Sequence, residues 1–73
     1  MPKLPVVSGE EVIKVLSKAG FIVRKGKGSH VVLQRPNDYR NVSVPLHKSL
    51  KPGTLRSIIK QAGLTVEEFV KLL

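Results

Sequence analysis

The segment GKGSH, from Gly26 to His30, holds the residue types in this 73-residue chain that are best suited to chemistry. A glycine-rich loop lets a phosphate approach backbone amides closely, and Lys27 adds a cation at its tip. Imidazole gives or takes a proton near neutral pH, and His30 directly follows this loop. RNA supplies its own nucleophile, the 2′-hydroxyl, so an acid–base group and cations are what RNA cleavage requires. The same pattern is also typical of an ordinary hairpin loop followed by an exposed strand histidine.

Further cations and a second histidine surround this segment in the sequence. Arg24 and Lys25 precede the loop. His47, in the run VPLHK, offers a second acid or base or a phosphate contact, although a histidine at the entry to a helix is an equally ordinary feature. The predicted catalytic residue is His30, and the predicted RNA-binding residues are Arg24, Lys25, Lys27, Gly28, Ser29, His47 and Lys48.

No other catalytic arrangement can be assembled from the sequence. The four glutamates, Glu10, Glu11, Glu67 and Glu68, fall at predicted helix starts, where capping and the helix dipole account for them. With no cysteine and two histidines, the chain lacks a disulfide framework and the four ligands of a structural zinc site. We therefore expect no metal and no cofactor.

The charge balance indicates the class of partner. Thirteen Lys and Arg against five acidic residues give a net charge of +8, which attracts polyanions, and nucleic acid above all. A membrane surface or an acidic protein are the alternatives on charge alone. Aromatic residues make up 4% of the chain, so no base-stacking platform is visible. No apolar run reaches the length of a membrane span or of a signal peptide, and we expect a cytoplasmic protein.

The apolar spacing predicts an α+β protein. A capping box, Ser8 to Glu11, starts a helix with an apolar stripe, and Thr65 to Glu68 is a second capping box. After residues 1–7, an extended lead-in, the predicted elements are a helix over Gly9–Ala19, strands over Phe21–Lys25, Ser29–Arg35 and Arg40–Val44, a helix ending before Gly63, and a short terminal helix. We expect one domain over residues 1–73, with the αβββα(α) order of double-stranded-RNA-binding domains and the helices on one face of a three-stranded antiparallel sheet.

Pairing the apolar positions of the strands predicts a register. The expected pairs are Lys25–Ser29, Val23–Val31 and Phe21–Leu33 in the first hairpin, and Arg35–Arg40, Leu33–Val42 and Val31–Val44 in the second. This register places His30 on the uncovered face of the sheet, beside Arg24.

The string GKGSH, preceded by an amphipathic helix that ends in AGF, resembles the signature of the HicA (YcfA-like) toxin family. The later run VPLHKSLKPGTLRSIIKQAGLTVEEF resembles the rest of that family's pattern, so the likeness covers Ser8 to about Leu73. It implies a fold like that of double-stranded-RNA-binding domains and cleavage of messenger RNA without the ribosome. The family's catalytic histidine maps onto His30, and the histidine of its Val-Pro-x-His step maps onto His47.

The resemblance also implies a protein partner. HicA toxins are neutralised by a HicB antitoxin encoded beside them, which covers the active site and usually brings a DNA-binding domain. Any association with DNA is then indirect. Two other functions fit the same composition: a non-catalytic RNA-binding module, for which a lone histidine at the loop has little use, and a basic protein whose target is an acidic partner.

Overall fold

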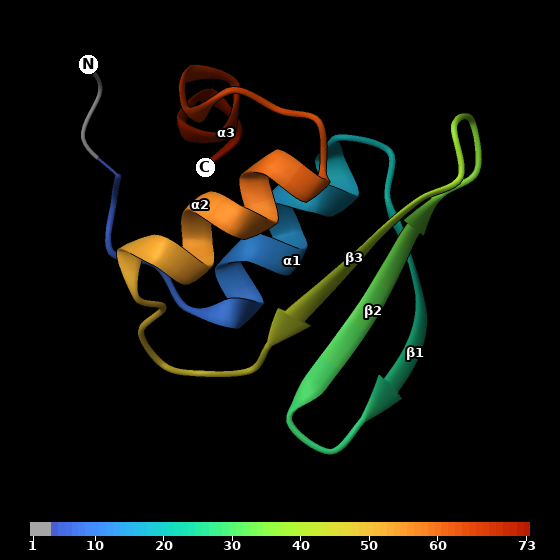
Figure 1. The fold of residues 1–73 in the computed structure, drawn as a ribbon, viewed down its shortest axis with the longest axis horizontal. Helices are drawn as coiled ribbons and strands as arrows, with labels where there is room; N and C mark the ends of the chain where they lie inside the picture. The colour runs from blue at the N-terminus through green and yellow to red at the C-terminus, as the bar shows by residue number, and fades with distance from the viewer. Residues whose placement is uncertain (1–3) are drawn as a thin grey trace.

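The computed structural model describes residues 4–73, apart from the side chains of Lys25 and Lys27. Residues 1–3 of the expected lead-in lie outside the described part. Figure 1 shows a helix, a three-stranded hairpin sheet and two further helices. The elements are α1 (Gly9–Lys18), β1 (Ile22–Lys27), β2 (His30–Arg35), β3 (Arg40–Pro45), α2 (Pro52–Gln61) and α3 (Val66–Leu72).

Both predicted capping boxes form and begin their helices. Ahead of α1, the Ser8 hydroxyl accepts from the Glu11 amide at 3.2 Å, and the Glu11 carboxylate accepts from the Ser8 amide at 3.1 Å. Thr65 and Glu68 make the same reciprocal pair ahead of α3. Helix α1 ends at Lys18, one residue before the predicted end, and Gly20 then takes a positive φ of 97°.

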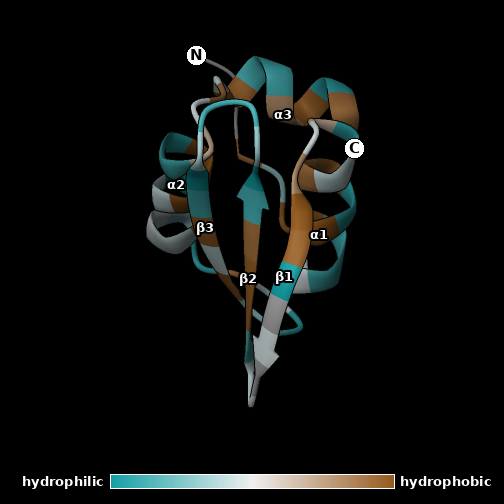
Figure 2. Cartoon of the chain, turned by 90° about the vertical axis from the view of Figure 1, so that its right-hand side faces the viewer, coloured by the Kyte–Doolittle hydropathy of each residue, from teal (hydrophilic) through white to brown (hydrophobic). Residues whose placement is uncertain are grey.

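The sheet is antiparallel in the order β1-β2-β3, and the helices lie behind it in Figure 2. Apolar side chains of α1, α2 and α3 pack against the alternate strand residues that face them, which makes one continuous core. The predicted fold class, α+β with the αβββα order of double-stranded-RNA-binding domains, is confirmed. The buried side chains are Val7, Val12, Val15, Leu16, Phe21, Leu33, Val42, Val44, Leu50, Leu55, Ile58, Ile59, Ala62 and Phe69.

The predicted register between β2 and β3 is confirmed: Val31 lies opposite Val44, and Leu33 lies opposite Val42. Because successive side chains alternate between faces, the side of the sheet away from the helices carries the other residues of β2, beginning with His30. We call this side the open face.

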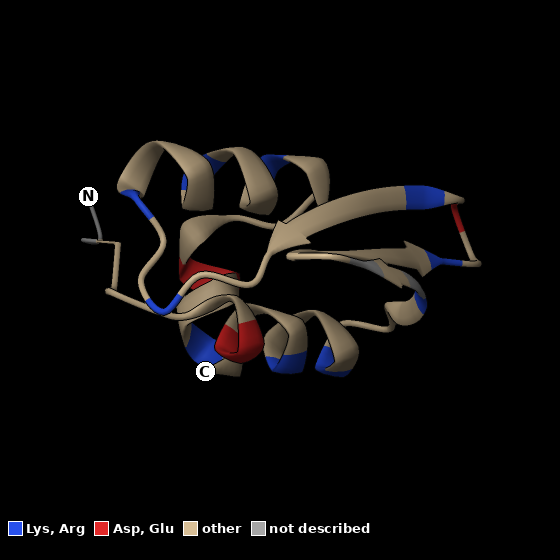
Figure 3. Cartoon of the chain, turned by 90° about the horizontal axis from the view of Figure 1, so that it is seen from below, with Lys and Arg blue, Asp and Glu red and all other residues tan. Residues whose placement is uncertain are grey.

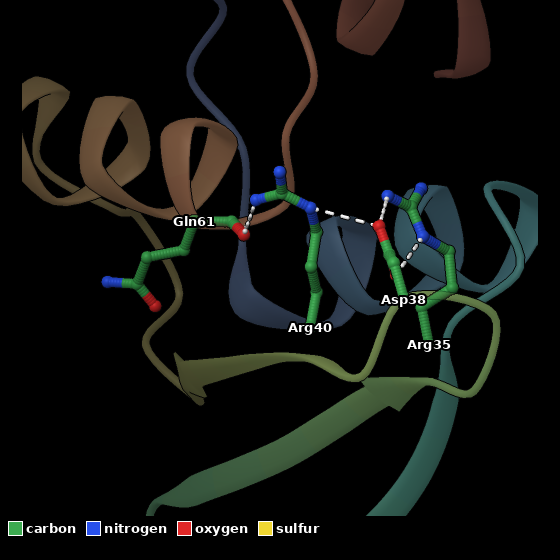
Figure 4. Close-up of polar contacts among 4 residues, drawn as sticks. All are labelled: Arg35, Asp38, Arg40 and Gln61. Atoms are coloured by element: carbon green, nitrogen blue, oxygen red, sulfur yellow. Dashed lines mark hydrogen bonds and ion pairs between the residues drawn. The ribbon is translucent and has the colours of Figure 1, made fainter.

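Charged side chains fix the far end of this hairpin (Figure 4). Arg35 donates to both carboxylate oxygens of Asp38, at 3.0 and 2.6 Å, and Arg40 donates to one of them at 3.0 Å. Arg40 also donates to the carbonyl of Gln61 at 3.3 Å, which links the hairpin to the last turn of α2. The hydrogen bonds from Arg35 lower the pKa of Asp38 to about 2, and the positive charge of Arg35 and the hydrogen bonds from Arg40 add to this effect.

The predicted register between β1 and β2 is wrong. Lys27, predicted to lie in the loop, belongs to β1 and pairs with His30. The two strands are joined by the two-residue turn Gly28–Ser29. Gly28 has a φ of 61° at the first central position, where a type II′ turn requires glycine. A β-bulge between Val23 and Lys25 then shifts the pairing again, so that Val23 lies opposite Leu33 and is 51% exposed.

Candidate active site

His30 is the first residue of β2, directly after the tight turn, and its side chain is exposed on the open face. Its Nδ1 lies 3.4 Å from the Ser29 hydroxyl oxygen, at the long end of hydrogen-bond distance. Its neighbour across the sheet is Pro45 of β3. A strand residue paired on both sides has a fixed backbone, so the sheet presents this imidazole to solvent from a rigid element.

Arg24 does not lie beside His30, as the predicted register required. The bulge moves it along the strand, and its Nε donates to the side-chain oxygen of Gln34 at 3.2 Å. Gln34 is four residues from His30 in β2, which at strand spacing is about 13 Å. The backbone of Arg24 lies at the bulge between Val23 and Lys25, and its side chain reaches along the open face to Gln34, away from His30.

The other predicted residues of the first hairpin stay close to His30 in the backbone. Lys27 is its pairing partner, and Gly28 and Ser29 form the turn that precedes it. Lys25 is two pairs further along, opposite Val32. The side chains of Lys25 and Lys27 lie outside the described residues.

The segment that contains His47 is hydrogen-bonded to the turn that precedes His30. The amide of Leu46 donates to the carbonyl of Ser29 at 2.6 Å, which joins the segment after β3 to the β1–β2 turn. The carbonyl of His47 accepts from the amide of Gly9 at 2.9 Å, which joins the same segment to the start of α1. His47 and Lys48 are both exposed. The fold thus brings the segment carrying these two residues, remote in sequence, to the edge of the site around His30.

Gly9 makes this close approach possible. A Cβ at position 9 would meet the carbonyl oxygen of Pro45 well inside van der Waals contact and would lie 3.0 Å from the Cα of Leu46. Both obstacles are backbone, so no side-chain rotation could relieve them. The start of α1 and the end of β3 can therefore touch only because residue 9 lacks a side chain.

A hollow of about 210 Å³ opens between the start of α1 and the segment after β3. Its lining residues are Ser8, Glu10, Leu46, His47 and Lys48. The sequence predicts RNA binding by His47 and Lys48. It indicates only a helix start at Ser8 and Glu10, and it assigns Leu46 to no site. The close contact between Gly9 and the segment after β3 brings these residues together, and no sequence pattern predicts that contact.

Lys and Arg occur along α1, along α2 and on the sheet, as the blue segments of Figure 3 show. In residues 4–73, no three side chains of the His, Cys, Asp or Glu type come together as metal ligands do. None of the described helices is long and apolar enough to cross a membrane.

These features define a small basic α+β protein with the fold of double-stranded-RNA-binding domains and a solvent-facing histidine beside a tight turn. Residues 9–64 match the family described as the HicA toxin of bacterial toxin–antitoxin systems. The match covers well over half of the chain, and the protein belongs to the HicA toxin family.

A solved structure gives the same result. The fold is similar to a chain of a toxin–antitoxin complex from Streptococcus pneumoniae, with a TM-score of 0.69 and 37% sequence identity. The likeness covers 80% of this chain and 98% of that chain. No curated protein matches the sequence.

Proposed function

We propose that this toxin is an endoribonuclease that cleaves single-stranded messenger RNA, with His30 as general acid or base. The observation that carries the proposal is the placement of His30. It is the exposed first residue of a paired strand, it follows a glycine turn, and a hydroxyl contacts one of its two ring nitrogens. Catalytic groups need this combination of a rigid backbone and free access to substrate.

The contact with Ser29 suggests how His30 acts. With Nδ1 engaged by the hydroxyl, Nε2 is the nitrogen left for substrate. Nε2 accepts the proton of a 2′-hydroxyl, the 2′-oxygen attacks the adjacent phosphorus, and the bond from phosphorus to the 5′-oxygen breaks. The phosphorus is left as a 2′,3′-cyclic phosphate, and the 5′-oxygen takes a proton from solvent water and leaves as a hydroxyl. General acid–base help of this kind contributes about 10²–10⁴-fold to the rate.

Cations near His30 would hold the RNA and stabilise the negative charge that builds on the phosphate. Lys48 follows His47 in the segment bonded to the turn, and Lys27 pairs with His30 in the sheet. Because the Arg24 side chain is bonded to Gln34, four residues along β2 from His30, we assign it to a phosphate further along the RNA.

The proposal includes a protein partner and a place in the cell. Membership of the HicA family, and the likeness to a chain of a toxin–antitoxin complex, support a HicB-type antitoxin that covers the open face around His30. DNA would be reached only through that antitoxin. Messenger RNA as substrate makes the cytoplasm the site of action.

The proposal is tested with purified protein and an end-labelled single-stranded RNA in the presence of EDTA. We expect cleavage by the wild-type protein under these conditions. Binding of the RNA without cleavage would make the protein an RNA-binding module of the same fold. Failure to bind RNA at any salt concentration would instead favour a basic protein that binds only its acidic partner.

A further inference from the structure

We infer that the hollow beside the active site binds one base of the RNA, a base that bears an amino group, and that Glu10 selects it. This inference rests on the proposed function and adds to it a determinant of sequence preference. It assigns a role to a carboxylate in a protein whose net charge is +8.

The hollow is adjacent to the site of cleavage. Leu46, one of its lining residues, donates its amide proton to Ser29, the residue before His30. An RNA strand with a phosphate at His30 therefore has a neighbouring nucleotide within reach of the hollow. The volume, about 210 Å³, is below the ~300–1,000 Å³ of sites for drug-sized ligands and suits one nucleobase.

The lining has the mixture of groups that single-stranded RNA sites use. The His47 imidazole offers a flat ring on which a base can stack, and Leu46, which is 42% exposed, offers an apolar surface beside it. Lys48 supplies a cation for the phosphate of the same nucleotide. Stacking and charge accept every base, so selection falls to the remaining polar group, the Glu10 carboxylate.

Glu10 is available for this role because α1 does not use it as a cap. The capping box is completed by Glu11, the next residue. Among the described residues, the carboxylate of Glu10 has no hydrogen-bond donor and no ion-pair partner. The positive end of the helix dipole favours a carboxylate in the first turn of α1, and the same carboxylate is free to accept hydrogen bonds from a base.

The acceptor-only chemistry of a carboxylate determines which bases fit. Guanine presents two neighbouring donors, N1–H and N2–H, which match both oxygens of Glu10. Cytosine and adenine present one amino group each. Uracil flanks its single N–H with two carbonyl oxygens that repel a carboxylate. We therefore expect the order guanine first, cytosine and adenine next, and uracil last.

The first test compares Glu10→Gln with Glu67→Gln. Both glutamates are exposed second residues of helices that start with a capping box, so the control removes the same charge from the same helical position. The substrates are uridine oligomers that carry one guanosine, cytidine, adenosine or inosine. We expect wild type and Glu67→Gln to cut next to guanosine ten- to a hundredfold faster than in uridine alone, and Glu10→Gln to lose most of this preference. Equal preference in both variants would overturn the inference.

A binding measurement separates failure of the inference from failure of the proposed function. In a His30→Ala background, fluorescence anisotropy gives the affinity for each oligomer without cleavage. Inosine lacks only the N2 amino group of guanosine, so this replacement should weaken binding about five- to tenfold when Glu10 is present and by a much smaller factor in Glu10→Gln, which keeps one acceptor oxygen. If wild type cuts no RNA but this difference appears, the base site stands and the nuclease proposal falls. If guanosine and inosine bind equally well to both proteins, the base site falls.

Discussion

Replacing Gly9 by alanine tests whether the contact between α1 and the end of β3 holds the site together. The new Cβ would overlap the carbonyl oxygen of Pro45 and press on the Cα of Leu46. Since both are backbone atoms, α1 and the segment after β3 must move apart. That movement stretches the hydrogen bond from the Gly9 amide to the carbonyl of His47, which is 2.9 Å long.

The magnitude follows from three contributions to the free energy of unfolding. Overpacking a tight contact costs about 1–3 kcal/mol. Loss of a backbone hydrogen bond costs about 1 kcal/mol more. Alanine favours a helix over glycine by at most ~1 kcal/mol, which offsets part of this. We expect Gly9→Ala to be destabilised by about 1–3 kcal/mol and to cleave RNA more slowly, because the segment carrying His47 loses its hydrogen bond to α1 and is no longer held in place beside the site.

The matched control is Gly53→Ala, near the start of α2, where an added Cβ meets nothing within 4 Å. Alanine there should leave the stability unchanged or raise it by about 0.4–1 kcal/mol. Urea unfolding of both variants gives the two free energies, and cleavage of a labelled RNA gives the rates. Equal stability of the two variants, with equal activity, would refute the account of Gly9.

Three further predictions concern other parts of the molecule. Asp38→Asn removes the partner of Arg35 and Arg40, and should lower the stability measured by urea unfolding at pH 7. Because the folded pKa of Asp38, about 2, lies below its ordinary 3.8, the stability lost in the variant should shrink as the pH falls from about 4 to about 2; a difference independent of pH would contradict this. Leu55→Ala, at a fully buried position, should cost about 2–5 kcal/mol by the same method, and a cost near zero would contradict its place in the core. Lys27→Ala should weaken RNA binding and reduce the slope of log affinity against log salt by about 0.7, whereas an unchanged slope would remove Lys27 from the site.

The parts of the fold that repeat a side-chain pattern could be predicted from the sequence. Val42 and Val44 alternate with polar residues and find their partners in β2 directly, which gave the correct second register. The capping boxes at Ser8 and Thr65 depend on residues three apart in sequence, and the structure confirms both.

The first hairpin could not be read in this way. Val31 pairs with Gly26, and a glycine has no side chain from which the face of the sheet could be inferred. The bulge at Arg24 also moves every residue beyond it to the opposite face of the sheet. Two glycines near the turn also allow either a three-residue or a two-residue loop. The expected contact between Arg24 and His30 failed for these reasons.

The composition of the candidate site was only partly readable. The residues next to His30 in sequence were found from the motif itself. Glu10 reaches the site through the backbone contact of Gly9 with His47, which are 38 residues apart in sequence. Leu46 reaches it through its hydrogen bond to Ser29, 17 residues away. Contacts of this kind depend on tertiary packing, and a single sequence carries no local pattern for them.

The most direct test of the central claim is the cleavage rate of His30→Ala, measured together with its thermal unfolding. Since the side chain of His30 is exposed, the substitution should leave the melting temperature unchanged. The rate of RNA cleavage should fall by at least the ~10²–10⁴-fold that an acid–base group contributes. Cleavage at the wild-type rate by a folded His30→Ala protein would contradict the account, and so would loss of cleavage explained by loss of the fold.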